Sequence, residues 1–192
     1  IDAAKDVAAQ FITGRTHDNI GLVIFAGESF TMCPMTTDHA VLLNLLKDVQ
    51  CGMIADMTAI GDGLATAVNR IKDGPAKSKT IILLTDGTNN AGDIAPVTAA
   101  QIAKSFGIRV YTIGVGTQGT APYGIEYQNI PVEIDEFTLK QIASTTGGEY
   151  FRATNKDVLK NIFSEIDKLE KTKLTVTEFS RREENFMPWA MM

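Results

Sequence analysis

Cysteine, histidine and basic residues are all scarce in this sequence. Its 192 residues include two cysteines, two histidines and one tryptophan, and Asp and Glu outnumber Lys and Arg by 23 to 18. A net charge of −5 excludes the basic surface that nucleic-acid binding requires. Cys33 and Cys51 have the spacing of neither a disulfide framework nor a zinc site. They could form one disulfide with each other, or both could be buried free thiols. No run of about 20 apolar residues predicts a membrane-spanning helix.

The usual signatures of nucleophilic catalysis are also missing. His17 and His39 lie in polar junctions with no cysteine or serine motif nearby, and G-x-S-x-G is absent. Asp62 and Asp86 could form an acid/base couple, but nothing in the sequence positions them, and solvated carboxylates are the default. The sequence therefore gives little support to an enzyme.

Apolar residues make up 44% of the chain, and its length suits one domain with a substantial core. Helices are predicted over residues 2–13, 40–49, 60–72, 98–106, 135–146 and 155–169, and strands over 19–26, 28–35, 81–85, 108–114 and 149–152. This alternation predicts an α/β fold, a parallel sheet with helices on both faces. Pro34 marks its strand as an edge strand, residues 115–132 read as a loop, and 173–179 could add a strand outside the domain.

The stretch 79–92, KTIILLTDGTNNAG, organises the rest of the chain. Its short apolar run predicts a buried parallel strand that ends at Asp86-Gly87. The carboxyl ends of such strands line the crevice where ligands bind, and a carboxylate there can hold a hard cation. Alternatively, Asp-Gly opens a turn in which Asp86 bonds its own backbone.

Thr58 lies just before the predicted helix 60–72. It is either the N-cap of that helix or, if its junction opens on the same sheet edge as Asp86, a hydroxyl ligand beside the carboxylate. Mg²⁺ keeps several waters, so a site needs few protein oxygens, and a helix N-terminus favours a partner's anion. We predict that Thr58 and Asp86 lie within a water's reach of each other.

Residues 114–119, GVGTQG, match the dinucleotide fingerprint G-x-G-x-x-G after a predicted strand. The fingerprint requires a helix to follow, and the sequence around Pro122 has the composition of a loop. The strand also comes late in the chain rather than first in a βαβ unit. We interpret the match as fortuitous; a dinucleotide-dependent enzyme would need an ordered helix after Gly119.

Several segments together resemble the von Willebrand factor type A (VWA) domain. They are NIGLVIFAGE (19–28), TAIGDGL (58–64), IILLTDG (81–87) and VYTIGVG (110–116). Within that family the chain is similar to the bacterial Bat aerotolerance proteins, BatA especially, at CPMTTDH (33–39), VEID (132–135) and DKLEKTKL (167–174). The resemblance covers nearly the whole chain. It implies a Rossmann-like fold with a central, mostly parallel sheet and one antiparallel edge strand.

The resemblance also implies a metal-ion-dependent adhesion site (MIDAS) built from three loops. The first loop of the family supplies Asp-x-Ser-x-Ser, the second a Thr and the third an Asp; Thr58 matches the second and Asp86 the third. The first loop and the first, central strand are missing from the sequence. We therefore expect residues 1–171 to be an N-terminally truncated VWA domain and 172–192 a juxtamembrane tail. Met57 departs from the family, which has Gly before the Thr.

By resemblance, the complete domain binds Mg²⁺, or Mn²⁺ or Ca²⁺, whereas this chain alone lacks the ligands of the first loop. The implied function is non-enzymatic, metal-dependent protein–protein interaction, in which a partner's Asp or Glu completes the metal site. A MoxR-type AAA ATPase and other Bat proteins are the implied partners. The alternative is a metal-independent scaffold or regulatory subunit of the same machinery.

A bacterial inner-membrane protein is also implied, with residues 186–192 starting a membrane helix and the domain facing the periplasm. Lys173, Arg181 and Arg182 instead favour the cytoplasmic side by the positive-inside rule. The sequence leaves the side open.

Overall fold

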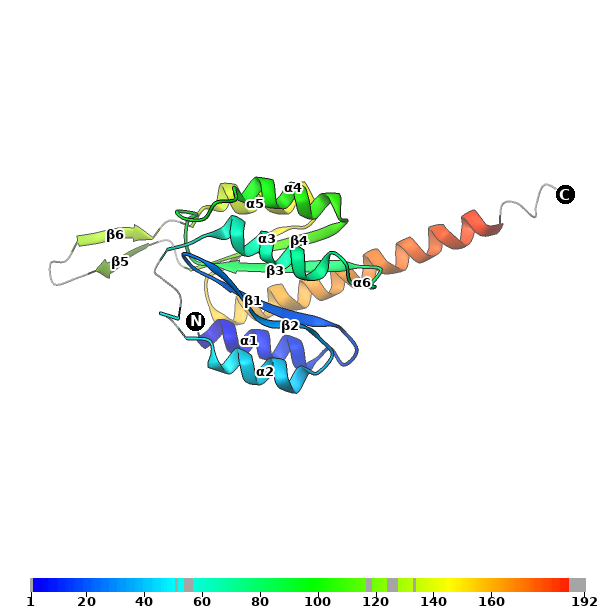
Figure 1. Cartoon of the computed structure of the whole chain (residues 1–192), viewed down its shortest axis with the longest axis horizontal. Helices are drawn as coiled ribbons and strands as arrows, with labels where there is room; N and C mark the ends of the chain where they lie inside the picture. The colour runs from blue at the N-terminus through cyan, green and yellow to red at the C-terminus, as the bar shows by residue number, and fades with distance from the viewer. Residues whose placement is uncertain are drawn as a thin grey trace.

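The computed structural model describes residues 2–50, 52–53, 57–116, 119–123, 128–132 and 134–186. In chain order, its elements are α1 (Asp2–Thr13), β1 (Ile20–Phe25), β2 (Ser29–Thr36), α2 (His39–Asp48), α3 (Ile60–Ile71), β3 (Lys79–Thr85), α4 (Pro96–Ser105), β4 (Ile108–Val115), β5 (Gly119–Tyr123), β6 (Gln128–Val132), α5 (Glu136–Thr146), β7 (Tyr150–Ala153) and α6 (Lys156–Phe186). Figure 1 shows two projections from the domain, the β5–β6 hairpin at one end and the last part of α6 at the other.

A parallel sheet of three strands, in the order β3-β4-β7, forms the centre of the domain. Alternate residues of β4 enter two cores. Val110 packs with buried residues of α3, α4 and α5 on one face, whereas Tyr111 and Ile113 pack with those of α1 and α6 on the other. This two-sided burial explains the continuous apolar runs of the strands. The predicted α/β fold, with helices on both faces, is confirmed.

The antiparallel pair β1–β2 lies beside this sheet as a separate ribbon. Pro34 lies in β2, as expected for an outer strand. Within the described residues, β1 and β3 are not hydrogen-bonded to each other, so each has an open edge. Ile82 and Leu84 of β3 are accordingly only half-buried, whereas Ile113 of β4 is fully buried. The missing first strand stays a prediction.

Local sequence signals place several helix ends. Oδ1 of Asp38 accepts from the Val41 amide, and Oδ1 of Asp135 accepts from the Thr138 amide. Asn155 caps α6 in the same way. These bonds satisfy amides that a helix leaves without an intrahelical partner.

Two of the predictions are wrong. Residues 173–179, expected to form a strand, lie within α6, which continues beyond the predicted end near residue 169. Lys, Glu and Arg favour helix, and a helix already packed on the core extends at little cost, whereas a lone strand has no partner. The loop predicted over 115–132 contains the β5–β6 hairpin. Its prolines obscured the strands, yet a two-stranded ribbon tolerates proline on its open edges.

Glu170 ties α6 to the sheet. Its side chain is buried, and one carboxylate oxygen accepts from the Tyr111 hydroxyl at 2.7 Å and from the Arg109 guanidinium. The other oxygen accepts from Thr80 at 3.0 Å and Ser78 at 3.2 Å. These partners lie in the amino-terminal half of β3 or β4 or just before β3. Beyond Glu170 the helix continues away from the body of the domain (Figure 1).

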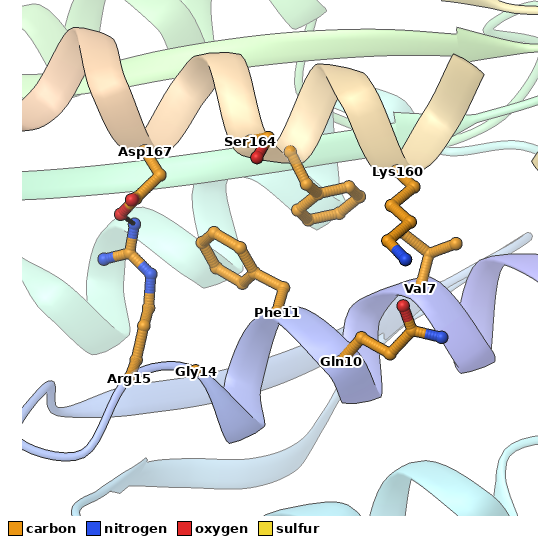
Figure 2. A pocket seen from close by; sticks show the side chains of 9 residues that line it. Val7, Gln10, Phe11, Gly14, Arg15, Lys160, Ser164 and Asp167 are labelled. Atoms are coloured by element: carbon orange, nitrogen blue, oxygen red, sulfur yellow. Dashed lines mark hydrogen bonds and ion pairs between the residues drawn. The ribbon is translucent and has the colours of Figure 1, made fainter. Parts of the chain in front are cut away.

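A hollow of about 200 Å³ separates α1 from α6 (Figure 2). Arg15 closes one end by pairing with both Asp18 and Asp167. Its guanidinium carbon lies 4.2 Å from the centroid of the Phe11 ring, which packs 5.0 Å from that of Phe163. These contacts fasten the end of α1 to the middle of α6.

Candidate functional site

Thr58 and the chain after β3 meet at the carboxyl end of the sheet. A Cβ added to Gly87 would lie 2.8 Å from Oγ1 of Thr58, so the threonine hydroxyl rests against the residue that follows Asp86. Thr85, at the end of β3, accepts a bond from the Gly87 amide at 3.3 Å. The structure therefore brings the two predicted metal-binding residues to the same sheet edge.

Two asparagines join the loop after β3 to the start of α3. Asn90 accepts from the Thr58 amide at 2.7 Å and donates its own amide to the Thr58 carbonyl at 3.0 Å. Asn89 accepts from the Ile60 amide at 2.8 Å. Asn89 therefore satisfies the first amide of α3, and the helix has Ala59 at its N-cap position with no side-chain cap. The alternative role of Thr58 as an N-cap is wrong.

Asp62 serves as a second clamp between the same segments. Its carboxylate accepts from the Ile94 amide at 2.8 Å and from the Asp93 amide at 3.2 Å. Gly92, at φ +94°, lies against this carboxylate. From the sequence, Asp62 was expected to be a solvated carboxylate, and this expectation is wrong. Its hydrogen bonds to backbone amides also argue against a role as a base. The sequence carries no signal for these bonds, because they form with amides distant in the chain.

Close glycine contacts allow α3 to start at this edge. A Cβ on Gly61 would lie 1.7 Å from the Ile94 carbonyl oxygen, and one on Gly63 would lie 2.6 Å from the Phe25 ring. The Ala59 amide also donates to the Ala26 carbonyl at 2.6 Å. The edge therefore joins the ends of β1 and β3 to the start of α3.

The side chains of Asn89, Asn90 and Asp62 are thus hydrogen-bonded, whereas those of the two predicted metal-binding residues are not. Among the described residues, neither the Thr58 hydroxyl nor the Asp86 carboxylate has a hydrogen-bond or ion-pair partner. Asp86 is exposed and Thr58 half-buried. The Gly87 amide bonds Thr85, so the alternative in which Asp86 only closes its own turn finds no support. Hydroxyl and carboxylate oxygens are ligands that Mg²⁺ accepts.

These two oxygens are fewer than a complete metal site has. The described part of the chain contains no group of three or more His, Cys, Asp or Glu placed to hold an ion. Water or further ligands would have to fill the remaining positions. Metal binding by Thr58 and Asp86 stays a prediction.

The dinucleotide interpretation of residues 114–119 is not supported. Gly114 lies in β4, and the chain forms strand β5 from Gly119 instead of the helix that the fingerprint needs. Gly114 leaves room for Ile134, because a Cβ there would lie 3.0 Å from Cγ2 of that side chain. Packing explains this glycine without a cofactor.

Cysteine chemistry does not contribute to this edge. Cys33 is buried, and its burial, with a smaller effect of the Asp38 charge, raises the pKa of the thiol. A buried thiol with a raised pKa is a poor nucleophile. Cys51, and with it the question of pairing, lies outside the described residues, as does part of the chain near Met57 and Tyr123.

Fold and edge together define a Rossmann-like α/β domain whose loop residues gather at the carboxyl ends of the strands. The family model of the von Willebrand factor type A domain matches residues 1–165, and the chain belongs to this family. VWA domains generally mediate protein interactions.

The similar structures include Bat proteins. The chain is 30% identical to an aerotolerance-related membrane protein from Bacteroides fragilis (TM-score 0.74; 87% of this chain and 88% of that chain). It is 29% identical to BatB from Bacteroides thetaiotaomicron (TM-score 0.75; 88% of each chain). The predicted similarity to the Bat family is confirmed. Proximal thread matrix protein 1 of the mussel byssus, with a zinc-occupied MIDAS motif, shares the fold at 23% identity (TM-score 0.69; 88% and 40%).

Curated relatives are longer than this chain. A UPF0353 protein of Mycolicibacterium paratuberculosis is 35% identical over 86% of the chain, which covers 52% of that protein. The chain spans about half the length of the curated relatives it matches. No helix in the described part of the chain is both long and apolar enough to span a membrane.

Proposed function

We propose that this protein is a non-enzymatic, metal-dependent interaction domain in which Thr58 and Asp86 help to hold a divalent cation. One observation carries the proposal. Where the loop after β3 meets the start of α3, the Thr58 hydroxyl and the Asp86 carboxylate lie at one sheet edge without a partner in the described residues, whereas the side chains of Asn89, Asn90 and Asp62 accept hydrogen bonds from backbone amides. The bonded side chains hold the loops in place and leave the other two available.

The chemistry of the two groups suits Mg²⁺, with Mn²⁺ or Ca²⁺ as alternatives. A bound divalent ion supplies the positive charge that attracts a partner's carboxylate. Thr58 contributes a neutral oxygen and Asp86 a single negative charge, so the ion would keep positive charge for an Asp or Glu of the partner. The mussel protein, which shares the fold, holds zinc in its MIDAS motif, so the fold can carry a divalent ion.

The anchoring of the domain is part of the proposal. Helix α6 leaves the domain at the end opposite the carboxyl edge (Figure 1), and it passes residue 172 without a break. We assign residues 172–192 to a juxtamembrane tail of a bacterial inner-membrane protein with a periplasmic domain. The Thr58–Asp86 edge would then face away from the membrane, toward other Bat proteins. By the same resemblance, a MoxR-type AAA ATPase is the functional partner of the assembly.

A metal-independent scaffold or regulatory subunit is the second candidate. It is favoured by the lack of a three-residue metal cluster in the described part of the chain. Under this alternative the same edge binds its partner without an ion.

Calorimetric titration of the intact protein with MgCl₂ and MnCl₂, together with thermal unfolding, separates the two candidates. Thr58→Val removes the hydroxyl ligand and Asp86→Asn removes the negative charge of the carboxylate ligand, each with little change in shape, and Asp93→Asn is the control on a nearby exposed carboxylate. At a metal concentration of 100 times Kd, we expect the native protein and the Asp93→Asn control to be stabilised equally, by about 2.7 kcal/mol. Both ligand variants should lose this stabilisation. Equal metal responses in all four proteins, or none in the native one, would favour the scaffold.

A further inference from the structure

Large apolar side chains are exposed near the proposed metal residues. Phe137, in the first turn of α5, is 77% exposed, and Met57, next to Thr58, is 54% exposed. Met53, a few residues earlier, is 51% exposed. Single exposed apolar residues are common, but several around a polar site are typical of protein-binding surfaces.

The sheet register places Phe137 at the same edge as Asp86. Thr85, which precedes Asp86, pairs with Gly114 at the end of β4. Ile134 packs over Gly114, and α5 starts two residues later. Helices α3, α4 and α5 lie side by side, so the starts of α3 and α5 are about 20 Å apart at normal packing distances of 8–10 Å per helix pair.

Folding does not require this exposure. At the start of α5, Ile134 and Leu139 form the buried apolar pair that anchors the helix, and both belong to the core. Phe137 lies between them in sequence but outside the core. Met57 likewise leaves its side chain in solvent, while Thr58 makes the backbone bonds that hold the loop.

The charges at this edge restrict the partner. Asp93 and Glu28 are exposed and have no ion-pair partner in the described residues. Glu28 belongs to this edge, because Ala26, two residues before it, accepts a hydrogen bond from the Ala59 amide at the start of α3. A partner segment with several acidic residues would be repelled by these carboxylates. A single carboxylate between apolar residues would meet the ion and avoid the repulsion.

On the basis of the proposed metal-dependent function, we infer that the partner is a protein loop carrying one carboxylate flanked by apolar side chains. Met57 contacts the flank on one side of the ion and Phe137 the flank on the other. The separation of about 20 Å between the two helix starts suits a protein surface and is too large for a small ligand. The β5–β6 hairpin projects from the same end of the domain (Figure 1).

The test uses the intact protein and two displayed libraries of short, disulfide-closed loops, selected in millimolar MgCl₂. The libraries differ only at the central position, which is Asp or Glu in one and Asn or Gln in the other. The binders are then measured against Phe137→Ser and Met57→Ser. Phe106→Ser is the matched control, because Phe106 is 46% exposed and lies just before β4 begins, at the other end of the sheet.

We expect binders only from the acidic library, with apolar residues enriched beside the carboxylate. Each edge variant should weaken them by about tenfold or more, the size of a moderate interface hot spot, and Phe106→Ser should leave them unchanged. Unchanged melting temperatures would show that the variants fold.

The failures of the two proposals are distinguishable. Binders that are lost with EDTA and in Asp86→Asn but unaffected by Phe137→Ser and Met57→Ser would overturn the inference and leave the metal function intact. Binders that survive EDTA and Asp86→Asn would overturn the metal function and the inference with it. No enrichment from either library would overturn the inference alone, since calorimetry measures the ion separately.

Discussion

Glu170 offers the most direct test of how α6 is held on the domain. Its carboxylate is the common acceptor for Tyr111, Arg109, Thr80 and Ser78. Glu170→Ala would remove the acceptor that the Arg109 guanidinium and the buried Tyr111 hydroxyl share. Loss of one partner of a buried ion pair costs about 3–5 kcal/mol. Because the Arg109 side chain is 26% exposed and can regain water, we expect about 3 kcal/mol.

Glu170→Gln is the matched variant. An amide keeps an oxygen that can accept from Tyr111 and Arg109, and the hydroxyls of Thr80 and Ser78 can rotate to accept from its NH₂ group. The change then removes mainly the charge, and we expect about 1.5 kcal/mol, the lower end for a hydrogen bond to a charged group. For a domain of this size, the Ala variant should melt about 6–12 °C lower than the native protein and the Gln variant about 3–6 °C lower.

The pH dependence gives an independent check. Burial raises the pKa of Glu170, but the hydrogen bonds from Tyr111 and Arg109 and the Arg109 charge outweigh it and hold this pKa below its ordinary value. The group therefore stabilises the fold fully above the ordinary glutamate pKa of about 4.3. That stability is lost as pH falls through the lower, folded-state pKa.

Urea unfolding followed by circular dichroism at several pH values measures both effects. The gap between native and Gln proteins should be constant from neutral pH to about pH 5 and shrink below about pH 4. Equal stabilities at neutral pH, or a gap that does not shrink in acid, would refute the assigned role of Glu170.

Three further predictions concern the site loops and the helix contacts. Gly61→Ala places a methyl group against the Ile94 carbonyl, and it should lower the free energy of unfolding in urea by at least about 2 kcal/mol. Gly74→Ala is the control, because its Cβ would meet only the Ile71 oxygen at 3.3 Å. Equal losses in the two variants would contradict the close approach. Asp62→Asn removes the charged acceptor of the Ile94 amide and should cost about 1.5–3 kcal/mol, with faster hydrogen exchange at Asp93 and Ile94; unchanged exchange would exclude the clamp. Arg15→Gln breaks the pairs to Asp18 and Asp167, and partial exposure limits the expected loss to about 1 kcal/mol; that loss should shrink in high salt, and a salt-independent loss would point to the packing on Phe11 instead.

Local patterns in the sequence were sufficient for most of the fold. The apolar run of β3 ended, as predicted, at Asp86, because a strand buried on both faces needs continuous apolar residues. Asp38, Asp135 and Asn155 marked helix starts, since a capping side chain bonds amides only two or three residues away. The β5–β6 hairpin was missed because its prolines are typical of a loop. The length of α6 was missed because the mixed polar pattern after residue 169 fits either a helix or a strand over a short window.

The sequence by itself determined the α/β class, the order of the helices and core strands and the two candidate metal residues, because these depend on neighbours within a few positions or on matching motifs. Only the tertiary structure decided which polar groups are engaged. Asn89 and Asp62 bond amides 29 and 32 residues away, and Glu170 accepts from Arg109 across 61 residues. Such pairings arise only when the folded chain brings distant backbone and side-chain groups together, and they left Thr58 and Asp86 without a partner in the described residues.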